Sequence, residues 1–266
     1  MNTTPIGVNT DDLRIAPKQA FRKAAEMRFR TIEFGVGAGE LSPKNLTGSG
    51  RRHVSRFVEG LGLGITSLVA DFPGMRLTDP RSVDERVTRT QDIIELAVDL
   101  HVGIVTTSLG AVAHPDTGEP APLAVQALRA LGEHADARGV LLAVRPSSDD
   151  AERTAILLAE VACPAVVVGL DPAAQVMAGH NPLALIEFAG GRIPLMHVRD
   201  GVVGNPARSG HETRLGDGDV DMVGVLAALQ GADFRGPYIV RRCQSDTPLE
   251  DLQVGHDRLA RLLPPA

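Results

Sequence analysis

The sequence predicts an α/β fold in which eight strand–helix units close into a single (β/α)8 barrel. The chain has 266 residues, and short β-branched runs alternate with amphipathic segments along it. Strand starts recur roughly every 25–45 residues, which is the length of a βα unit. Eight such units typically occupy about 250 residues. Because neither a shift in composition nor a long linker divides the chain, we expect residues 1–266 to form one domain.

The expected strands are apolar along almost their whole length. This pattern is typical of a parallel sheet, whose strands are covered on both faces. The strands are predicted at residues 6–9, 31–35, 64–70, 103–107, 140–144, 165–170, 193–198 and 237–240.

Helical periodicity fills the intervals between these strands. From 222 to 229, apolar side chains recur at i, i+3, i+4 and i+7, which places them on one helix face. Similar spacing predicts helices within 83–97 and 249–263. Pro17 suits the first turn of the first helix, where no backbone N–H is needed.

A doubly wound sheet is the competing topology. It usually has fewer strands and often a glycine-rich phosphate-binding turn after the first strand. Here the first strand is followed by Asn-Thr-Asp-Asp at 9–12, which is no such turn. The strand count and this turn favour the barrel.

Composition excludes several classes of function. The chain carries 27 basic and 33 acidic residues, for a net charge of −6, and only 3% of its residues are aromatic. A nucleic-acid or membrane-surface binder needs a basic face, so we expect neither partner. Cys163 and Cys243 are too few for a disulfide framework and lack zinc-site spacing. The N-terminus has no signal-peptide pattern, and we expect a cytoplasmic protein.

Polar residues end the apolar strands. In a barrel these ends meet at the C-terminal mouth, where active sites are built. Each such residue alone is equally explained as a loop start or a helix cap. Together they predict a polar pocket. They are Asn9, Glu33, Asp71, Thr107, Ser108, Arg145, Asp171, His197, Asp200 and Arg241, and the polar loops that follow strands include 35–50, 111–122 and 202–219.

Four segments resemble motifs of the xylose isomerase-like barrels, a superfamily of sugar and sugar-phosphate isomerases and epimerases. LDP at 170–172 with AGHNP at 178–182 is similar to its "l-D-p…a-G-x-d-p" stretch. HVRD at 197–200 is similar to "H-[ivl]-[kr]-D", and LGDGDVD at 215–221 to "G-x-G-x-v-D". GPYIV at 236–240 lies where the family has "y-x-G-x-i-x-i-E". The chain therefore resembles a divergent member of that superfamily.

The resemblance implies a divalent-metal site made of Glu, Asp, His and Glu on the last four strands. In the epimerases the two glutamates also exchange the proton of the substrate carbon, and the metal polarises its oxygens. Asp171 and His197 match this set. Arg145 and Arg241 stand where the two glutamates are expected.

These two replacements predict that the usual metal site is lost. An arginine about 5 Å from a divalent ion costs roughly 7 kcal/mol at an effective dielectric constant of about 20. Arginine is also never a general base near neutral pH. We expect no cofactor, and Mn, Co, Mg or Zn only if other residues supply ligands.

The remaining mouth residues suggest roles in a site without metal. We expect Asp171 to orient His197, which titrates near neutrality and can act as a base. Glu33 is the one further carboxylate placed near the mouth; it is a third catalytic candidate or an arginine's ion-pair partner. Arg145 and Arg241 could bind a carboxylate or phosphate through their planar forks.

Asn9, Asp200 and Arg214 are the other candidate substrate-binding residues. Arg214, with Arg208, lies on the loop after the seventh strand, where basic residues of the family reach a substrate phosphate. A solvated loop is the alternative interpretation of both arginines.

The function predicted is that of a sugar (phosphate) isomerase/epimerase-like protein with a degenerate metal site, which binds a small polyol or an anionic sugar-like ligand. Whether it is an enzyme stays open; its chemistry would be intramolecular proton transfer. The alternatives are a non-catalytic binding protein on the same fold, a metal-dependent epimerase if the strand register differs, and an endonuclease IV-like enzyme, which the acidic balance disfavours. Barrels of this size often pair, so a homodimer is compatible with the sequence.

Overall fold

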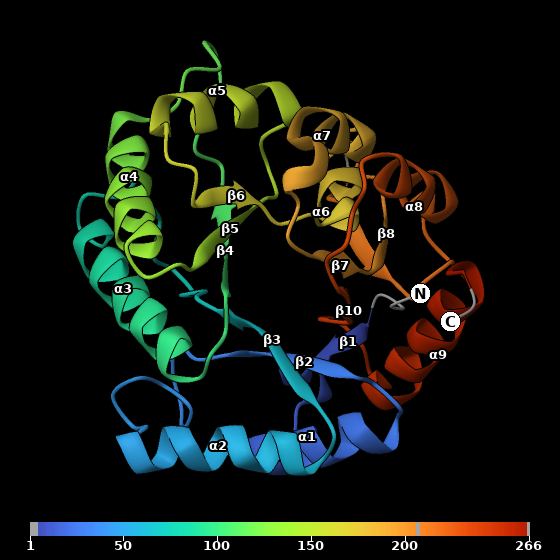
Figure 1. Cartoon of the computed structure of the whole chain (residues 1–266). Coiled ribbons are helices and arrows are strands. Elements are labelled where there is room, and N and C mark those ends of the chain that lie inside the picture. The colour runs from blue at the N-terminus through green and yellow to red at the C-terminus, as the bar shows by residue number, and fades with distance from the viewer. Residues whose placement is uncertain (1–4, 206–207, 265–266) are drawn as a thin grey trace.

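A ring of eight parallel strands forms the centre of the computed structural model, which describes residues 5–205 and 208–264 (Figure 1). Neighbouring strands follow the order β6-β5-β4-β3-β2-β1-β10-β7. An isolated parallel bridge between Leu170 and Met196 joins β6 to β7 and closes the ring. The strands are β1 (Ile6–Asn9), β2 (Thr31–Gly35), β3 (Gly64–Val69), β4 (Ile104–Gly110), β5 (Leu141–Pro146), β6 (Val166–Val168), β7 (Met196–Val198) and β10 (Tyr238–Val240).

Helices follow the strands and surround the ring (Figure 1). Five of them begin at a proline, where the missing N–H costs no hydrogen bond, and Pro17 is one of these. The helices are α1 (Pro17–Glu26), α2 (Gly48–Gly60), α3 (Val83–Asp99), α4 (Pro122–Asp136), α5 (Ala151–Val161), α6 (Pro172–Met177), α7 (Pro182–Ala189), α8 (Met222–Gly231) and α9 (Pro248–Leu262), with 3-10 turns at Thr10–Leu13 and Gly190–Arg192.

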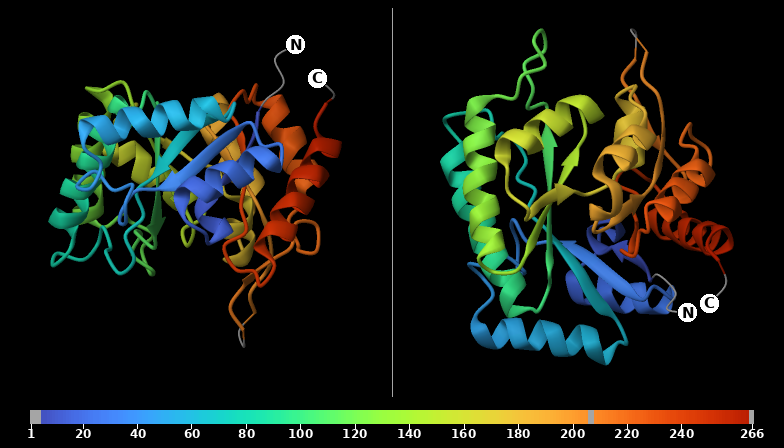
Figure 2. Two further views of the ribbon diagram at one scale, coloured as in Figure 1. Left: turned by 90° about the horizontal axis from the view of Figure 1, so that it is seen from below. Right: turned by 45° about the horizontal axis from the view of Figure 1, so that its top comes forward.

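The predicted barrel is confirmed, and each predicted strand is present. The ring closure excludes the doubly wound sheet, which is open at its edges. One element was not predicted. The segment expected as a loop contains an antiparallel hairpin of β8 (Asp200–Val202) and β9 (His211–Thr213), which projects beyond the ring of helices (Figure 2). Its strands have three residues each, too few for an alternating pattern to show.

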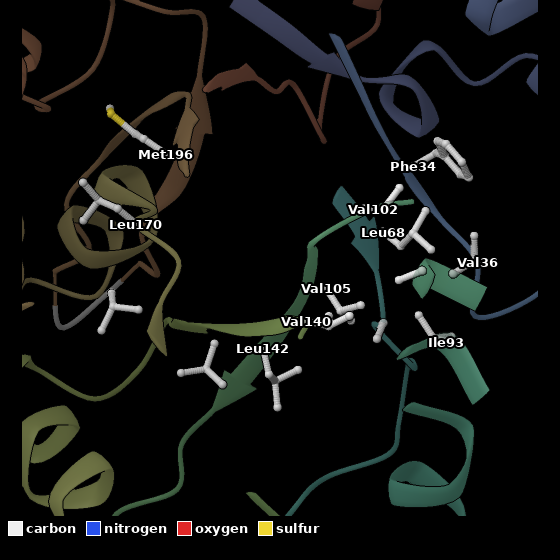
Figure 3. Close-up of a cluster of buried hydrophobic side chains, with 14 of the residues drawn as sticks. Phe34, Val36, Leu68, Ile93, Val102, Val105, Val140, Leu142, Leu170 and Met196 are labelled. Atoms are coloured by element: carbon white, nitrogen blue, oxygen red, sulfur yellow. The ribbon is translucent and has the colours of Figure 1, made fainter. Parts of the chain in front are cut away.

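Buried apolar side chains fill the space between the strands and the helices. Phe34, Leu68 and Leu142 from three strands are fully buried, as is Ile93 from α3 (Figure 3). Because both faces of the strands are covered, the polar residues that end them collect at the C-terminal mouth. Within the described ranges, no helix is long and apolar enough to cross a membrane.

Candidate functional site

Glu33, at the end of β2, is the centre of a fully buried polar cluster. Its Oε1 accepts a hydrogen bond from Asn9 Nδ2 at 2.7 Å, and its Oε2 accepts from Ser67 Oγ at 2.7 Å. His197 Nε2 lies 2.9 Å from Oε1, and the Thr106 hydroxyl lies 3.4 Å from Oε2. Donors from β1, β3, β4 and β7 therefore meet on one carboxylate, which no single segment of the chain could supply.

Two opposing influences set the pKa of Glu33. Burial is the largest and raises it, but the interaction with His197 and the charges of Arg241 and Arg145 together outweigh burial. The pKa of Glu33 is therefore well below its usual range. The pKa of His197 is lowered, because burial disfavours the imidazolium more than Glu33 favours it. At neutral pH the pair is thus a carboxylate and a neutral imidazole.

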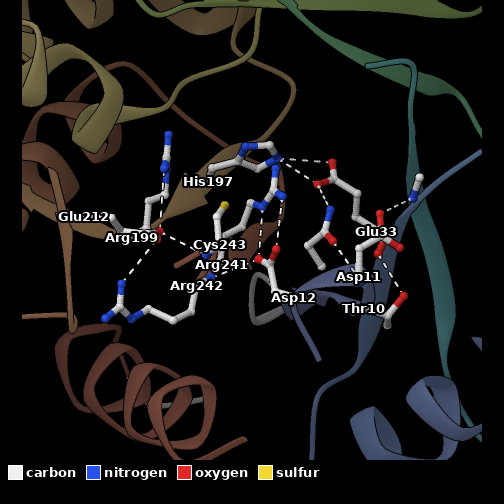
Figure 4. A network of polar contacts seen from close by, with 12 residues as sticks. Thr10, Asp11, Asp12, Glu33, His197, Arg199, Glu212, Arg241, Arg242 and Cys243 are labelled. Atoms are coloured by element: carbon white, nitrogen blue, oxygen red, sulfur yellow. Dashed lines mark hydrogen bonds and ion pairs between the residues drawn. The ribbon is translucent and has the colours of Figure 1, made fainter. Parts of the chain in front are cut away.

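The orientation of His197 differs from the one expected. Its Nδ1 lies 3.5 Å from Arg145 Nη1 and 3.9 Å from Asp171 Oδ2, the latter beyond hydrogen-bonding distance. Since a guanidinium has no acceptor, Nδ1 accepts and Nε2 carries the proton toward Glu33. Glu33, not Asp171, therefore orients this ring (Figure 4).

Asp171 is bound by Arg199 instead. Arg199 donates from Nε to Oδ1 at 3.0 Å and from Nη2 to Oδ2 at 2.8 Å, a two-bond guanidinium–carboxylate pair. Oδ1 also accepts from the Ala174 amide and so caps α6. Burial raises the pKa of Asp171, but the opposite effect of Arg199 and His197 is larger. The pKa of Asp171 is therefore well below its usual range.

Arg199 was not among the predicted site residues. Its signal was present in the HVRD motif, where it lies two positions after His197 and thus on the same side of an extended strand. Glu212 of β9 holds it from the other direction: Oε1 lies 3.6 Å from Arg199 Nη1, and Oε2 lies 3.2 Å from Arg242 Nη1. The unpredicted hairpin therefore anchors this part of the mouth (Figure 4).

Arg145, on β5, is buried and contacts two strands. Its Nη2 donates to Asp71 Oδ2, its Nη1 faces His197, and its buried Nε has no hydrogen-bond partner among the described residues. Asp71 is fixed in turn by the Ser108 amide, which donates to Oδ1 at 2.7 Å. Burial raises the pKa of Asp71, but Arg145 and the Ser108 amide outweigh it and lower the pKa overall.

Arg241, at the end of β10, binds Asp12 through two bonds of 3.2 and 3.3 Å (Figure 4). Asp12 also accepts from the Arg242 amide at 2.9 Å. Within residues 5–205 and 208–264, Arg241 Nη1 has no protein hydrogen-bond partner. Asp12, from the Asn-Thr-Asp-Asp turn that follows the first strand, supplies this partner.

Asp200 has a different role from the one expected. Its Oδ1 accepts from the amides of Gly201 (2.8 Å) and Val220 (3.1 Å), and its Oδ2 from those of Gly216 (2.7 Å) and Gly218 (3.1 Å). A Cβ added at Gly218 would lie 2.3 Å from Asp200 Oδ1, which explains the glycine. Both carboxylate oxygens of Asp200 therefore bind backbone amides, and the side chain shapes the 216–220 loop.

Arg214 also lies outside the cluster around Glu33 and pairs with residues of α9. Its guanidinium pairs with Asp251 at 2.6 Å and Glu250 at 3.1 Å, both at the start of α9. The predicted residues that the fold brings together are thus Glu33, His197, Arg145, Asn9 and Asp171, with Arg241 close enough for its charge to act on Glu33 and His197. Asp200 and Arg214 lie in other contacts.

The four positions at which the resemblance implies metal ligands are occupied by protein contacts among the described residues. Arg145 and Arg241 occupy two of them, Asp171 is held by Arg199, and Nδ1 of His197 faces a guanidinium. In the described part of the chain, no three His, Cys, Asp or Glu side chains converge in a way that could hold a metal ion.

The closed ring and the polar groups at its C-terminal mouth define a (β/α)8 barrel. The family model described as xylose isomerase-like TIM barrel matches residues 21–262, and the chain belongs to this family. No curated protein sequence matches the chain.

Solved structures resemble this fold at low identity. A xylose isomerase domain protein from Planctomyces limnophilus has a TM-score of 0.85 at 20% identity, with 98% of each chain covered. A D-tagatose 3-epimerase-like protein has a TM-score of 0.79 at 16% identity, covering 97% of this chain and 96% of that one. An IOLI protein with a bound zinc atom has a TM-score of 0.79 at 18% identity, with 97% of each chain covered. At these identities the likeness shows the fold alone.

Proposed function

We propose that the chain is a divergent sugar isomerase/epimerase-like protein that binds a small polyhydroxylated molecule at the mouth of the barrel without a divalent metal. One observation carries the proposal. Arg145 and Arg241 each keep an N–H with no protein partner among the described residues, Nε of the first and Nη1 of the second. Arg241 Nη1 is not among the fully buried unpaired atoms of the described residues, so it is the donor that an acceptor oxygen of a ligand can reach directly. Arg145 Nε is closed to solvent, and its side chain has to shift before it can donate to a ligand.

The balance of charge favours an uncharged ligand over a phosphate ester. Each guanidinium at the mouth already faces a carboxylate, and Glu33 adds one more negative charge. A phosphate dianion would therefore enter a site without excess positive charge. The sequence is compatible with either a polyol or an anionic sugar-like ligand, and we favour the polyol.

The degenerate metal site is the second part of the proposal. A cation at the family positions would have to displace Arg199 from Asp171 and lie beside two guanidinium groups. If Arg145 and Arg241 moved away to make room, Asp71 and Asp12 would lose their charged partners and keep only the Ser108 and Arg242 amides as donors.

Binding without turnover is a second candidate function. Every carboxylate of the cluster is engaged: Glu33 by four donors and Asp171 by Arg199. If proton transfer occurs, His197 is the base that we favour, because it is neutral and Glu33 holds its Nε2; Arg145 Nη1, 3.5 Å from Nδ1, then has to move aside to free that nitrogen.

Two measurements test the proposal. Metal analysis of protein purified without chelator, followed by thermal-shift titration with Mn²⁺, Co²⁺ and Mg²⁺, should give less than stoichiometric metal and no concentration-dependent rise in melting temperature. Calorimetric titration with four- to six-carbon ketoses and alditols should show binding that a chelator does not alter. One equivalent of bound metal, or binding that requires Mn²⁺, would overturn the proposal.

A matched pair of variants tests the arginine. Arg241→Lys keeps the positive charge opposite Asp12 but removes the Nη1 donor, and should weaken sugar binding roughly tenfold. Arg235→Lys changes an exposed arginine (84% of its side chain accessible) and should leave affinity unchanged. Equal affinities for the two variants would remove Arg241 from the site.

A further inference from the structure

A separate cavity of about 440 Å³ opens at the C-terminal ends of β1, β2 and β3. The loops after these strands line it with Asp11, Gly37, Leu41, Asp71, Phe72 and Met75 among others. Its size lies in the range of small-molecule sites. Asp71 lines this cavity and also contacts the site described above, because its carboxylate accepts a hydrogen bond from Arg145.

Asp11 presents an unused acceptor to this cavity. Its Oδ2 accepts from the Gly35 amide at 2.8 Å, whereas its Oδ1 has no protein hydrogen-bond partner in the described part of the chain. A Cβ added at Gly35 would lie 2.6 Å from Oδ2. The glycine therefore allows the carboxylate to lie against the end of β2, where it lines the cavity.

The other walls combine the apolar side chains of Leu41, Phe72 and Met75 with the charged side chains of Glu40 and Arg89. The Arg89 guanidinium lies 4.4 Å from the centre of the Phe72 ring and donates to the Gly37 carbonyl at 2.6 Å. A Cβ added at Gly37 would lie 2.9 Å from the Asp71 carbonyl oxygen. The loop is thus held against Phe72 by a contact that a larger residue would prevent.

The two halves of the mouth have opposite hydrogen-bonding character. The unpaired groups of Arg145 and Arg241 are donors only, whereas an ionised carboxylate is an acceptor only. A ligand that bridges the halves needs acceptor oxygens at one end and O–H groups at the other. Apolar walls beside a carboxylate also suit the C–H and O–H groups of a short polyol chain.

We propose that this cavity binds a vicinal diol of the ligand, and that Asp11 is the acceptor that selects for it. The two hydroxyls donate to the carboxylate, one to Oδ1 and one to the remaining lone pair of Oδ2. The orientation of the ligand, with its acceptor end toward Arg145 and Arg241, rests on the proposed function above.

Two acyclic ketones isolate the diol. Erythrulose has a carbonyl group and a vicinal diol, whereas hydroxyacetone has the carbonyl group without the diol. Binding to the full chain is measured by calorimetry, or by ligand-observed NMR if it is weak. Erythrulose should bind wild-type protein at least roughly tenfold more tightly than hydroxyacetone, the value of one charge-assisted hydrogen bond.

Asp11→Asn is the test variant, because an asparagine oxygen can still accept from the Gly35 amide while the charge is lost. It should reduce the preference for erythrulose to within roughly twofold and leave hydroxyacetone binding unchanged. Asp84→Asn, an exposed carboxylate in the first turn of α3 outside the cavity, is the control and should keep the wild-type preference.

The outcomes separate the two proposals. An unchanged preference in Asp11→Asn overturns the diol site and leaves the proposed function intact. If neither ketone binds, the carbonyl end of the ligand is not recognised by Arg145 and Arg241 as the proposed function requires, and threitol, which has diols but no carbonyl, tests the cavity alone. Threitol binding that Asp11→Asn weakens supports the diol site; no threitol binding overturns it.

Discussion

Two buried carboxylates at the same end of the barrel are satisfied in opposite ways. Glu33 takes its donors from side chains on four strands, whereas Asp200 takes all of its donors from backbone amides of one nearby loop and its own neighbour. The first arrangement links segments far apart in sequence and fixes His197 beneath Arg145. The second shapes one loop. Buried charge alone therefore does not distinguish a site residue from a structural one; the origin of the donors does.

Removing the Glu33 carboxylate should have the largest effect on stability. Glu33→Ala leaves the donors of Asn9, Ser67 and His197 buried without an acceptor, and we expect the free energy of unfolding to fall by about 3–5 kcal/mol. Urea denaturation followed by circular dichroism measures this loss. Glu33→Gln keeps the shape of the side chain and an acceptor oxygen, so the free energy of unfolding should fall by a smaller amount.

Asp200→Ala is the comparison that could contradict this view. Two of its four donors, the amides of Gly216 and Gly218, are only partly buried and can bond to water once the loop moves. The loss should therefore be smaller, about 2–3 kcal/mol, and sugar affinity should not change. A larger loss than for Glu33→Ala would show that the loop, not the side-chain cluster, dominates stability at this end.

Acid should weaken the Glu33 cluster together with Asp171 and Asp71, whose folded-state pKa values are also lowered, and a Glu33 variant isolates its share. Because the folded-state pKa of Glu33 is lowered, its stabilisation is present above its unfolded pKa of about 4.5 and is lost as the pH falls below that value. Between about pH 5 and pH 3, the free energy of unfolding should fall less steeply for Glu33→Gln than for wild type, by up to about 1.4 kcal/mol per pH unit. Urea denaturation at several pH values measures this difference. If the free energy of unfolding falls with pH at the same rate for wild type and Glu33→Gln, Glu33 is not ionised in the folded state.

The sequence was sufficient for the barrel because each strand is an apolar run of typical length. It also placed Glu33, His197, Arg145 and Arg241 at one mouth, since a polar residue ending a parallel strand has only one end of the barrel to occupy. The sequence did not predict which of these charged side chains pair with one another. Asp171 binds Arg199 rather than His197, and Arg241 binds Asp12, because pairing depends on the rotation of each side chain around the ring. The hairpin that carries Glu212 had no periodic signal.

Arg214 and Arg241 differ in burial, although the sequence predicts substrate binding for both of them. Arg241 is mostly buried beside Asp12, whereas Arg214 is 37% exposed and pairs with residues at the start of α9. The pair with Glu250 is exposed and contributes little to stability, and the buried Asp251 keeps Arg242 and Ser245 as donors, so Arg214→Ala should leave the melting temperature and the sugar affinity close to wild type. Arg241→Lys, a milder change, should weaken binding. If Arg214→Ala reduces sugar affinity in calorimetry as much as Arg241→Lys does, the guanidinium leaves α9 when ligand binds, and the mouth extends to the loop after β9.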